Sequence, residues 1–330
     1  MEFFDILWLG KPLWMWFAFL AIVAVLLALD LGVFHRKQRE IGVGESLALS
    51  GVYIALGLAF GGWVWWYMGE GAGLAYITGF VIEKSLAMDN VFVIAMIFTY
   101  FAVPRVYQHR VLFWGILGVI VLRALMIGVG ATLVEKFSWV LYVFAAFLIF
   151  TGIKMWRNAD QAFDIGTSPI LTWVKRRFRV TEALHGQSFW VRQPDAETGK
   201  PVLFITPLFL ALVMVEVVDV VFAVDSVPAI FAITTDPFLV YTSNIFAILG
   251  LRALYFALAA MVDRFHYLKY ALSLLLVFIG AKIFITDALG LAKIPPAASL
   301  SITFAILAAG VGWSLWKTRT PEVADAKAGL

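Results

Sequence analysis

Two stretches of the chain, residues 79–92 and 215–228, place acidic side chains inside otherwise apolar sequence. An ionised side chain in the middle of a membrane-spanning helix costs several kcal/mol, so it must face protein, water or a cation. Five acids against one lysine leave negative charge that a bound cation can neutralise. The side chains expected to form this cation path or site are Glu83, Asp89 and Asn90 in the first stretch and Glu216, Asp219, Asp225 and Ser226 in the second.

The ligand types narrow the cation that such a site would bind. Carboxylates, the Asn90 amide and the Ser226 hydroxyl are hard oxygen donors, which suit Mg²⁺, Ca²⁺ or Mn²⁺ better than Zn²⁺ or Cu⁺. The chain has no cysteine, and its four histidines fall in predicted loops, so a thiolate or imidazole metal site is not expected. Oxygen ligands alone do not separate manganese from calcium.

The spacing of the acids constrains how they act together. On a regular helix, Glu83 and Asp89 lie roughly 120° apart in azimuth and about 9 Å apart along the axis, so they cannot share one ion directly. Either the two stretches form two stacked sites, or their helices unwind between the acids. Pro228 removes a backbone donor just after Asp225 and makes a break plausible in the second stretch.

A structural role is the alternative for these acids, in which basic residues inside the helix bundle pair with them. Lys84, Arg123 and Arg252 are the candidate partners, and Lys84 with Glu216 forms an attractive pair because neither has a counterpart in the other stretch. The two arginines, each in the middle of an apolar segment, are expected to balance acids rather than to touch a cationic substrate.

The composition predicts the elements that position these residues. Hydrophobic residues make up 62% of the 330-residue chain and charged residues 14%, whereas soluble domains are about 45–50% apolar and about 25% charged. The chain is therefore expected to be an all-α polytopic membrane protein covered by lipid, and its net charge of +3 is too small to suggest nucleic acid as a partner. Nine segments hold about 20 mostly apolar residues each: 13–34, 46–68, 74–100, 111–134, 138–156, 203–232, 240–262, 268–288 and 297–316.

Basic residues fall in alternate connections between these segments. They occur at 35–39, at 105–110, in the long loop 157–202, at 264–269 and after the last segment. The positive-inside rule therefore predicts an N-terminus outside and a C-terminus in the cytoplasm. One transmembrane domain is expected to span residues 1–330, with 157–202 as a cytoplasmic hairpin or partly ordered linker and 320–330 as a disordered tail.

An internal repeat organises the predicted helices. The sequence at Phe150–Lys154 recurs at 278–282, and that at Leu122–Leu125 recurs at 251–254. Glu83 followed by Asp89 matches Asp219 followed by Asp225, and all offsets are roughly 128 to 136 residues. Residues 74–156 and 203–288 are thus expected to be two three-helix copies in opposite orientations, as in many secondary transporters.

These acidic segments resemble the TerC/Alx family of integral membrane proteins. The resemblance runs from Asp30 to about Trp316 and is most specific in the segments Glu83–Phe92 and Glu216–Ile230. It implies a manganese exporter of the bacterial inner membrane, in a wider superfamily of exporters like LysE with inverted three-helix repeats.

The function expected from these observations is outward secondary transport of Mn²⁺, coupled to protons, with no prosthetic group. The chain contains no nucleotide-binding motif, so an ion gradient would supply the energy. One rival is transport of Ca²⁺ or another divalent cation, and another is a membrane scaffold whose 157–202 loop docks partner proteins. An enzyme is not expected, because Asp219 and Asp225 lie in one helix rather than on facing helices as in an aspartyl protease dyad.

Overall fold

The computed structural model describes residues 5–32, 42–158, 165–166, 168–194, 199–258, 267–288 and 294–318. Within these ranges the side chains of seven residues lie outside the description: Asp30, Leu31, Gly32, Asp89, Arg252, Asp287 and Ala288. The predicted tail 320–330 also lies outside the described residues.

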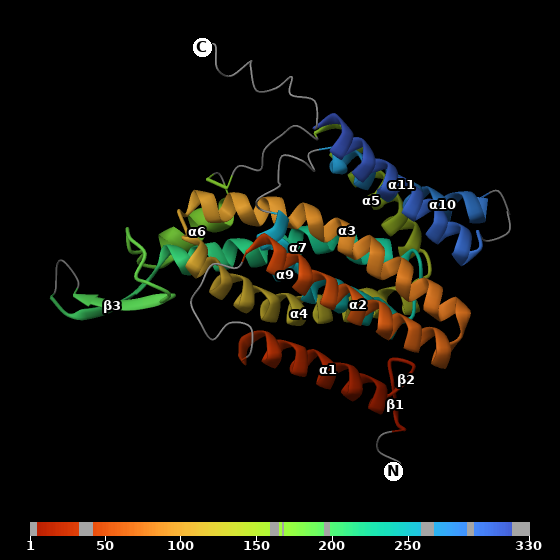
Figure 1. The fold of residues 1–330 in the computed structure, drawn as a ribbon, viewed down its shortest axis with the longest axis horizontal. Coiled ribbons are helices and arrows are strands. Elements are labelled where there is room, and N and C mark those ends of the chain that lie inside the picture. The colour runs from red at the N-terminus through yellow and green to blue at the C-terminus, as the bar shows by residue number, and fades with distance from the viewer. Residues whose placement is uncertain are drawn as a thin grey trace.

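The described chain is mainly helical (Figure 1). Its helices are α1 (Leu13–Gly32), α2 (Val43–Met68), α3 (Glu70–Tyr100), α4 (Arg105–Lys136), α5 (Val140–Arg157), α6 (Pro169–Arg177), α7 (Pro207–Phe231), α8 (Pro237–Leu249), α9 (Leu251–Leu258), α10 (Leu268–Ala288) and α11 (Pro296–Lys317). Two short antiparallel hairpins join β1 (Leu7–Trp8) to β2 (Lys11–Pro12) and β3 (Trp190–Pro194) to β4 (Pro201–Ile205).

Six of the described helices, α2, α4, α5, α7, α10 and α11, are long and apolar enough to cross a membrane. Large apolar side chains such as Val121 and Leu125 on α4 and Phe150 on α5 are more than half exposed in the isolated chain. Apolar surface of this extent requires a lipid environment. The prediction of an all-α polytopic membrane protein is therefore confirmed.

The segment predicted as one helix at 240–262 differs from the prediction. It contains two helices, α8 and α9, that are interrupted at Gly250. A helix end leaves carbonyl groups without intrahelical partners, and Lys84 Nζ from α3 donates a 3.0 Å hydrogen bond to the Ala247 carbonyl there. A cation at a helix C-terminus is favoured by the helix dipole, so Lys84 stabilises this interruption.

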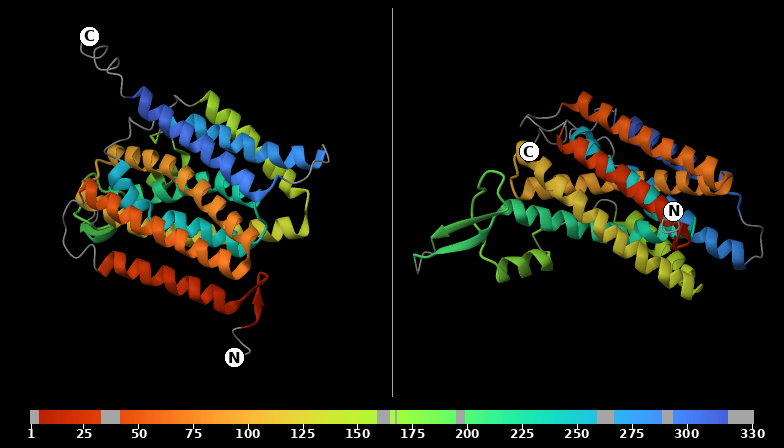
Figure 2. Two further views of the ribbon diagram at one scale, coloured as in Figure 1. Left: turned by 45° about the vertical axis from the view of Figure 1, so that its right-hand side comes forward. Right: turned by 90° about the horizontal axis from the view of Figure 1, so that it is seen from below.

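The loop predicted at 157–202 contains structure of its own. Ser168 caps the short helix α6, and a β-hairpin follows, in which Trp190 pairs with Ile205. The predicted sixth spanning segment was wrong in its start at residue 203, because 203–205 belong to β4 and α7 begins at Pro207. The hairpin projects beyond the end of α7, away from the helical bundle (Figure 2).

The centre of the bundle is built from helices of both halves of the chain. α3 packs against α2, α7 and α8, and α4 packs against α7 and α8. α5 lies along α10, with α11 next to them, and this group forms one side of the molecule in Figure 1 and in the left view of Figure 2. α1 lies on the opposite side.

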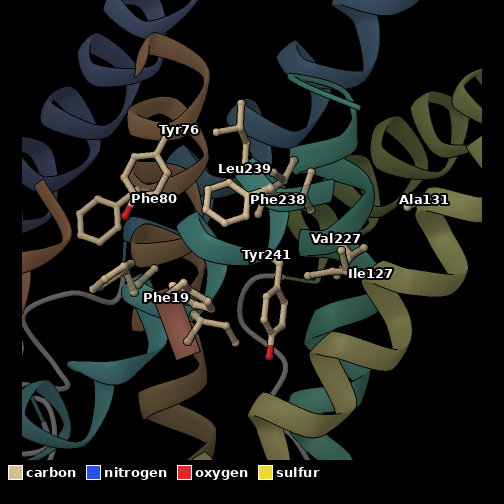
Figure 3. Close-up of a cluster of buried hydrophobic side chains, with 14 of the residues drawn as sticks. Phe19, Tyr76, Phe80, Ile127, Ala131, Val227, Phe238, Leu239 and Tyr241 are labelled. Atoms are coloured by element: carbon tan, nitrogen blue, oxygen red, sulfur yellow. The ribbon is translucent and has the colours of Figure 1, made fainter. Parts of the chain in front are cut away.

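Aromatic side chains connect α1 to the centre (Figure 3). Phe19 on α1 contacts Tyr241 on α8 with ring centroids 5.7 Å apart, and Trp16 contacts Phe238 at 5.1 Å. Tyr76 of α3 extends the same cluster. Because lipid tails are as apolar as these rings, close packing rather than the hydrophobic effect holds such helices together.

Candidate cation site

Arg123 of α4 lies at the centre of a buried polar cluster. Its Nη1 donates to Glu83 Oε1 at 2.6 Å, and its Nη2 and Nε donate to the two oxygens of Asp219 at 3.2 and 3.3 Å. Nη1 also lies within hydrogen-bond distance of Ser226 Oγ, at 2.8 Å, and of Asn244 Oδ1, at 3.1 Å. One guanidinium thus joins α3, α7 and α8 to α4.

The helices place these partners by their periodicity. Asp219 and Ser226 are seven residues apart on α7, two turns along one face, so both reach the same side chain. Arg123 and Glu83 are each 1% exposed. A planar guanidinium with five donors suits such a two-carboxylate arrangement better than a lysine would. The prediction that Arg123 balances acids is confirmed; the Arg252 side chain lies outside the description.

A small cavity of about 10 Å³ adjoins the cluster, which is enough for about one water molecule. Four of its lining residues carry oxygen atoms of the predicted cation site: Glu83, Asn90, Asp225 and Ser226. Glu83 Oε2 and Asn90 Oδ1 are buried, and neither has a hydrogen-bond partner within the described structure. Buried polar atoms are nearly always paired, so two unpaired oxygens at one cavity indicate that a water molecule or ion belongs there.

Asp225 of α7 also lines the cavity, together with Met155 of α5. Its carboxylate accepts a hydrogen bond from Thr151 and lies in the field of Lys154. Lys154 lies in the last turn of α5, and its positive charge acts on this acid.

Glu216 does not join the cluster. It packs on α4 at Gly118, where an added Cβ would overlap its carboxylate, and its Oε2 has no partner among the described side chains. The predicted Lys84–Glu216 pair was wrong, because Lys84 points toward the end of α8 while Glu216 faces α4. Asp219 also lines a second, mostly apolar cavity of about 30 Å³ together with Asn90.

Both acidic helices are continuous. α3 runs from Glu70 to Tyr100, and α7 runs through Pro228 to Phe231, so the break considered near Asp225 is not present. Asp89 lies on α3, but its side chain is outside the description. Among the described residues, no three acidic or histidine side chains come together as a metal-binding group. A cation at the small cavity would therefore need the Asn90 and Ser226 oxygens or water as further ligands.

Comparison with known proteins places this arrangement in a family. The profile of the integral membrane protein TerC family matches residues 68–322, which include every residue of the buried cluster. This chain belongs to the TerC family. The resemblance of the two acidic segments to TerC/Alx proteins is thereby confirmed.

Several relatives align over nearly their whole length. A Myxococcus xanthus membrane protein designated STKORF319 is 46% identical over 97% of each chain. A Rickettsia bellii membrane protein is 47% identical over 90% of this chain and 95% of its own. Alx of Escherichia coli K12, whose name proposes a membrane-bound redox modulator, is 47% identical over 90% of this chain and 92% of its own. No solved structure matches the chain.

Asn244 is the residue of the cluster that the sequence did not single out. It is 0% exposed, and its Oδ1 accepts from Arg123. A polar residue within the apolar run 237–249 was the available signal, because such side chains rarely face lipid. The repeat pointed to α3 and α7, whereas Asn244 comes from α8, the helix that α3 packs against.

Proposed function

We propose that this chain is a secondary transporter that moves Mn²⁺ out of the cytoplasm. The observation that carries the proposal is the small cavity between the acidic helices, where Glu83 Oε2 and Asn90 Oδ1 lack partners. Asp225 and Ser226 complete its set of hard oxygen donors. Oxygen donors in a confined site suit a divalent cation such as Mn²⁺. The cavity holds about one water molecule, so it fits a small ion and not an organic substrate.

The charges around the cavity support a cation as substrate. Arg123 and Lys154 face three carboxylates, those of Glu83, Asp219 and Asp225. When these three acids are ionised, one negative charge remains, which a bound cation counteracts. Uncompensated charge in a membrane interior is costly, so it favours binding of such an ion.

The packing of α5 and α10 supports the inverted repeat that the proposal requires. A Cβ at Gly152 would lie 2.7 Å from Val277 Cγ2, and one at Gly280 would lie 2.9 Å from Ile149 Cγ1. Gly152 and Gly280 are 128 residues apart, and so are Ile149 and Val277. The two helices thus contact each other through equivalent residues in exchanged positions, as a two-fold relation between the copies predicts.

The cluster supports this proposed relation, because it lies where the two copies would meet. Glu83 and Asp219 are equivalent in the repeat, and both bind Arg123. Substrate sites of inverted-repeat transporters lie at the interface of the copies near the bilayer midplane. We propose nine spanning segments, with α8 and α9 together forming one of them. The N-terminus would lie outside the bacterial inner membrane and the C-terminus in the cytoplasm.

Proton antiport is the proposed energy source, because the same carboxylates can hold protons or metal. The name of Alx proposes a redox role for that relative. In this chain, thiol chemistry is excluded because the sequence has no cysteine. Export of a metal ion is consistent with the buried carboxylates. A redox role without thiols does not explain why these carboxylates are buried.

The test is uptake of Mn²⁺ and Ca²⁺, side by side, into liposomes that contain the protein with its cytoplasmic face outward. We expect saturable Mn²⁺ uptake that Asp225→Asn abolishes. Glu135→Gln is the matched control, because Glu135 is an exposed acid in the last turn of α4 and does not line the cavity. Saturable Ca²⁺ uptake without Mn²⁺ uptake would replace the substrate. Absence of any metal flux from folded protein would remove the transporter proposal.

A further inference from the structure

A larger cavity, of about 320 Å³, lies at one end of the helical bundle. In the proposed orientation, this end faces the outer side of the membrane. Ala75 and Thr78 of α3 line it, together with Thr234 after the end of α7 and Asp236 before α8. Lys282 of α10 and Ser299 of α11 complete its polar wall. The connections at this end, between α2 and α3 and between α7 and α8, are poor in basic residues.

Two helices, α3 and α7, run from the charged cluster toward this cavity. On α3, Thr78 is five residues before Glu83, or about 7.5 Å along the axis. Ile233 at the cavity comes seven residues after Ser226 of the cluster and two residues after the end of α7. The two helices that hold the proposed cation site therefore also lead to the larger cavity.

Buried apolar residues lie between the levels of the two cavities along α3 and α7. Ile82 of α3 and Ala229 and Ile230 of α7 are each 0% exposed. Gly79 lets α3 approach its neighbours here, because an added Cβ would lie 3.0 Å from Ser243 Oγ of α8 and 3.3 Å from Ile230 Cγ2 of α7. One to two helical turns of mainly apolar, buried side chains thus lie between Glu83 and the outer cavity.

The wall of the outer cavity carries positive charge. Lys282 is half-buried and donates to Ser299 Oγ at 3.1 Å, and no described carboxylate forms an ion pair with it. Asp236 already pairs with Lys11 at 2.8 Å and caps α8. The N-terminal ends of α3, α8 and α11 also border the cavity and add to the positive potential.

We propose that this cavity is the outer vestibule of the transport path and that the layer of Gly79, Ile82, Ala229 and Ile230 is its gate. Lys282 then lowers the local concentration of cations in the vestibule, so that a released ion does not readily return to Glu83. When the ion is more concentrated outside the cell than inside, an exporter benefits from weak rebinding of the ion on its outer face. This inference rests on the proposed function, and it adds the exit route and the residue that controls return.

The absence of cysteine from the chain allows a direct test of the vestibule. Single substitutions Ala75→Cys and Ser299→Cys are treated with a membrane-impermeant thiol reagent in sealed liposomes of known orientation. We expect both to react from the face that carries the Gly69 turn and not from the opposite face. Ala229→Cys, in the gate, and Leu125→Cys, on the lipid-facing surface of α4, are the matched controls and should react much more slowly.

Equal reactivity of Ala75→Cys from both faces, or reactivity no faster than that of the controls, would overturn the vestibule. This readout requires no metal flux. If the vestibule cysteines react as expected but the protein moves no divalent cation, the proposed function fails and the labelling result still describes the cavity.

A separate experiment tests the role of Lys282. It measures the concentration of Mn²⁺ on the outer face of the protein that reduces efflux by half. Lys282→Met should lower this concentration several-fold, because cations reach the vestibule more easily, whereas Lys282→Arg keeps the charge and should leave it near the wild-type value. Unchanged inhibition in an actively transporting Lys282→Met protein would overturn the role of this lysine.

Discussion

Replacing Arg123 by Met tests the buried cluster most severely. Methionine keeps an unbranched stem but carries no charge, so the substitution leaves Glu83 and Asp219 facing each other without a counter-ion. Both acids are buried, at 1% and 7% exposure of their side chains. Breaking one buried ion pair costs about 3–5 kcal/mol, because the remaining charge loses its partner and cannot regain water.

Thermal unfolding of the purified protein in mild detergent measures this cost. At roughly 2 °C per kcal/mol, the low end of the range for domains of 150–250 residues, the midpoint should fall by about 6–10 °C. Lys11→Met is the matched control, since it breaks an ion pair whose side chains are each 23% exposed. Pairs exposed to solvent contribute about 0–1 kcal/mol, so the control should shift the midpoint by about 2 °C or less.

A triple variant separates lost pairing from lost packing. Arg123→Met combined with Glu83→Gln and Asp219→Asn removes the arginine and both negative charges together. Replacement of a whole buried ion pair is often neutral, so this variant should recover most of the lost stability. If the single variant unfolds like the Lys11→Met control, or if the triple variant is no more stable than the single one, the account of the cluster is refuted.

Two further substitutions test the packing around the site. Lys84→Met should cost about 1–3 kcal/mol in the same unfolding assay, because the Ala247 carbonyl loses its partner at the end of α8. Lys136→Met, on the exposed last turn of α4, should cost far less. Gly152→Val should destabilise by about 1–3 kcal/mol through overpacking of α5 against α10, whereas Gly128→Val, where an added Cβ meets no atom within 4 Å, should be better tolerated. If a test variant lowers the stability by no more than its control does, the contact that it tests is contradicted.

The sequence was sufficient to find the acids and the arginine of the cluster, because a charge within an apolar run has few stable places. Glu83, Asp219 and Arg123 stand out for that reason. Which acid meets which base was not predictable, because partners depend on the rotation of each helix about its axis. Lys84 and Glu216 carry opposite charges on neighbouring helices, yet they face different neighbours.

The sequence also did not predict where a helix is interrupted. Gly250 within an apolar run is compatible with a continuous spanning helix, and the break becomes evident once Lys84 is seen to bind the Ala247 carbonyl. Conversely, Pro228 suggested a break that the structure does not have. α7 continues through it to Phe231, so the proline lies within the last turn of the helix.

Equilibrium binding of Mn²⁺ to the purified protein, followed by loss of the free-ion electron paramagnetic resonance signal, tests the central claim most directly. The wild type should bind Mn²⁺ saturably, and Asp225→Asn and Asn90→Ala should each weaken binding by about tenfold or more, since even outer-shell partners of metal ligands contribute about 10–100-fold. Glu216→Gln, the acid that packs on Gly118 away from the cavity, should weaken binding much less. Equal losses in all three variants, or no saturable binding by the wild type, would contradict a cation site at the cavity beside Arg123.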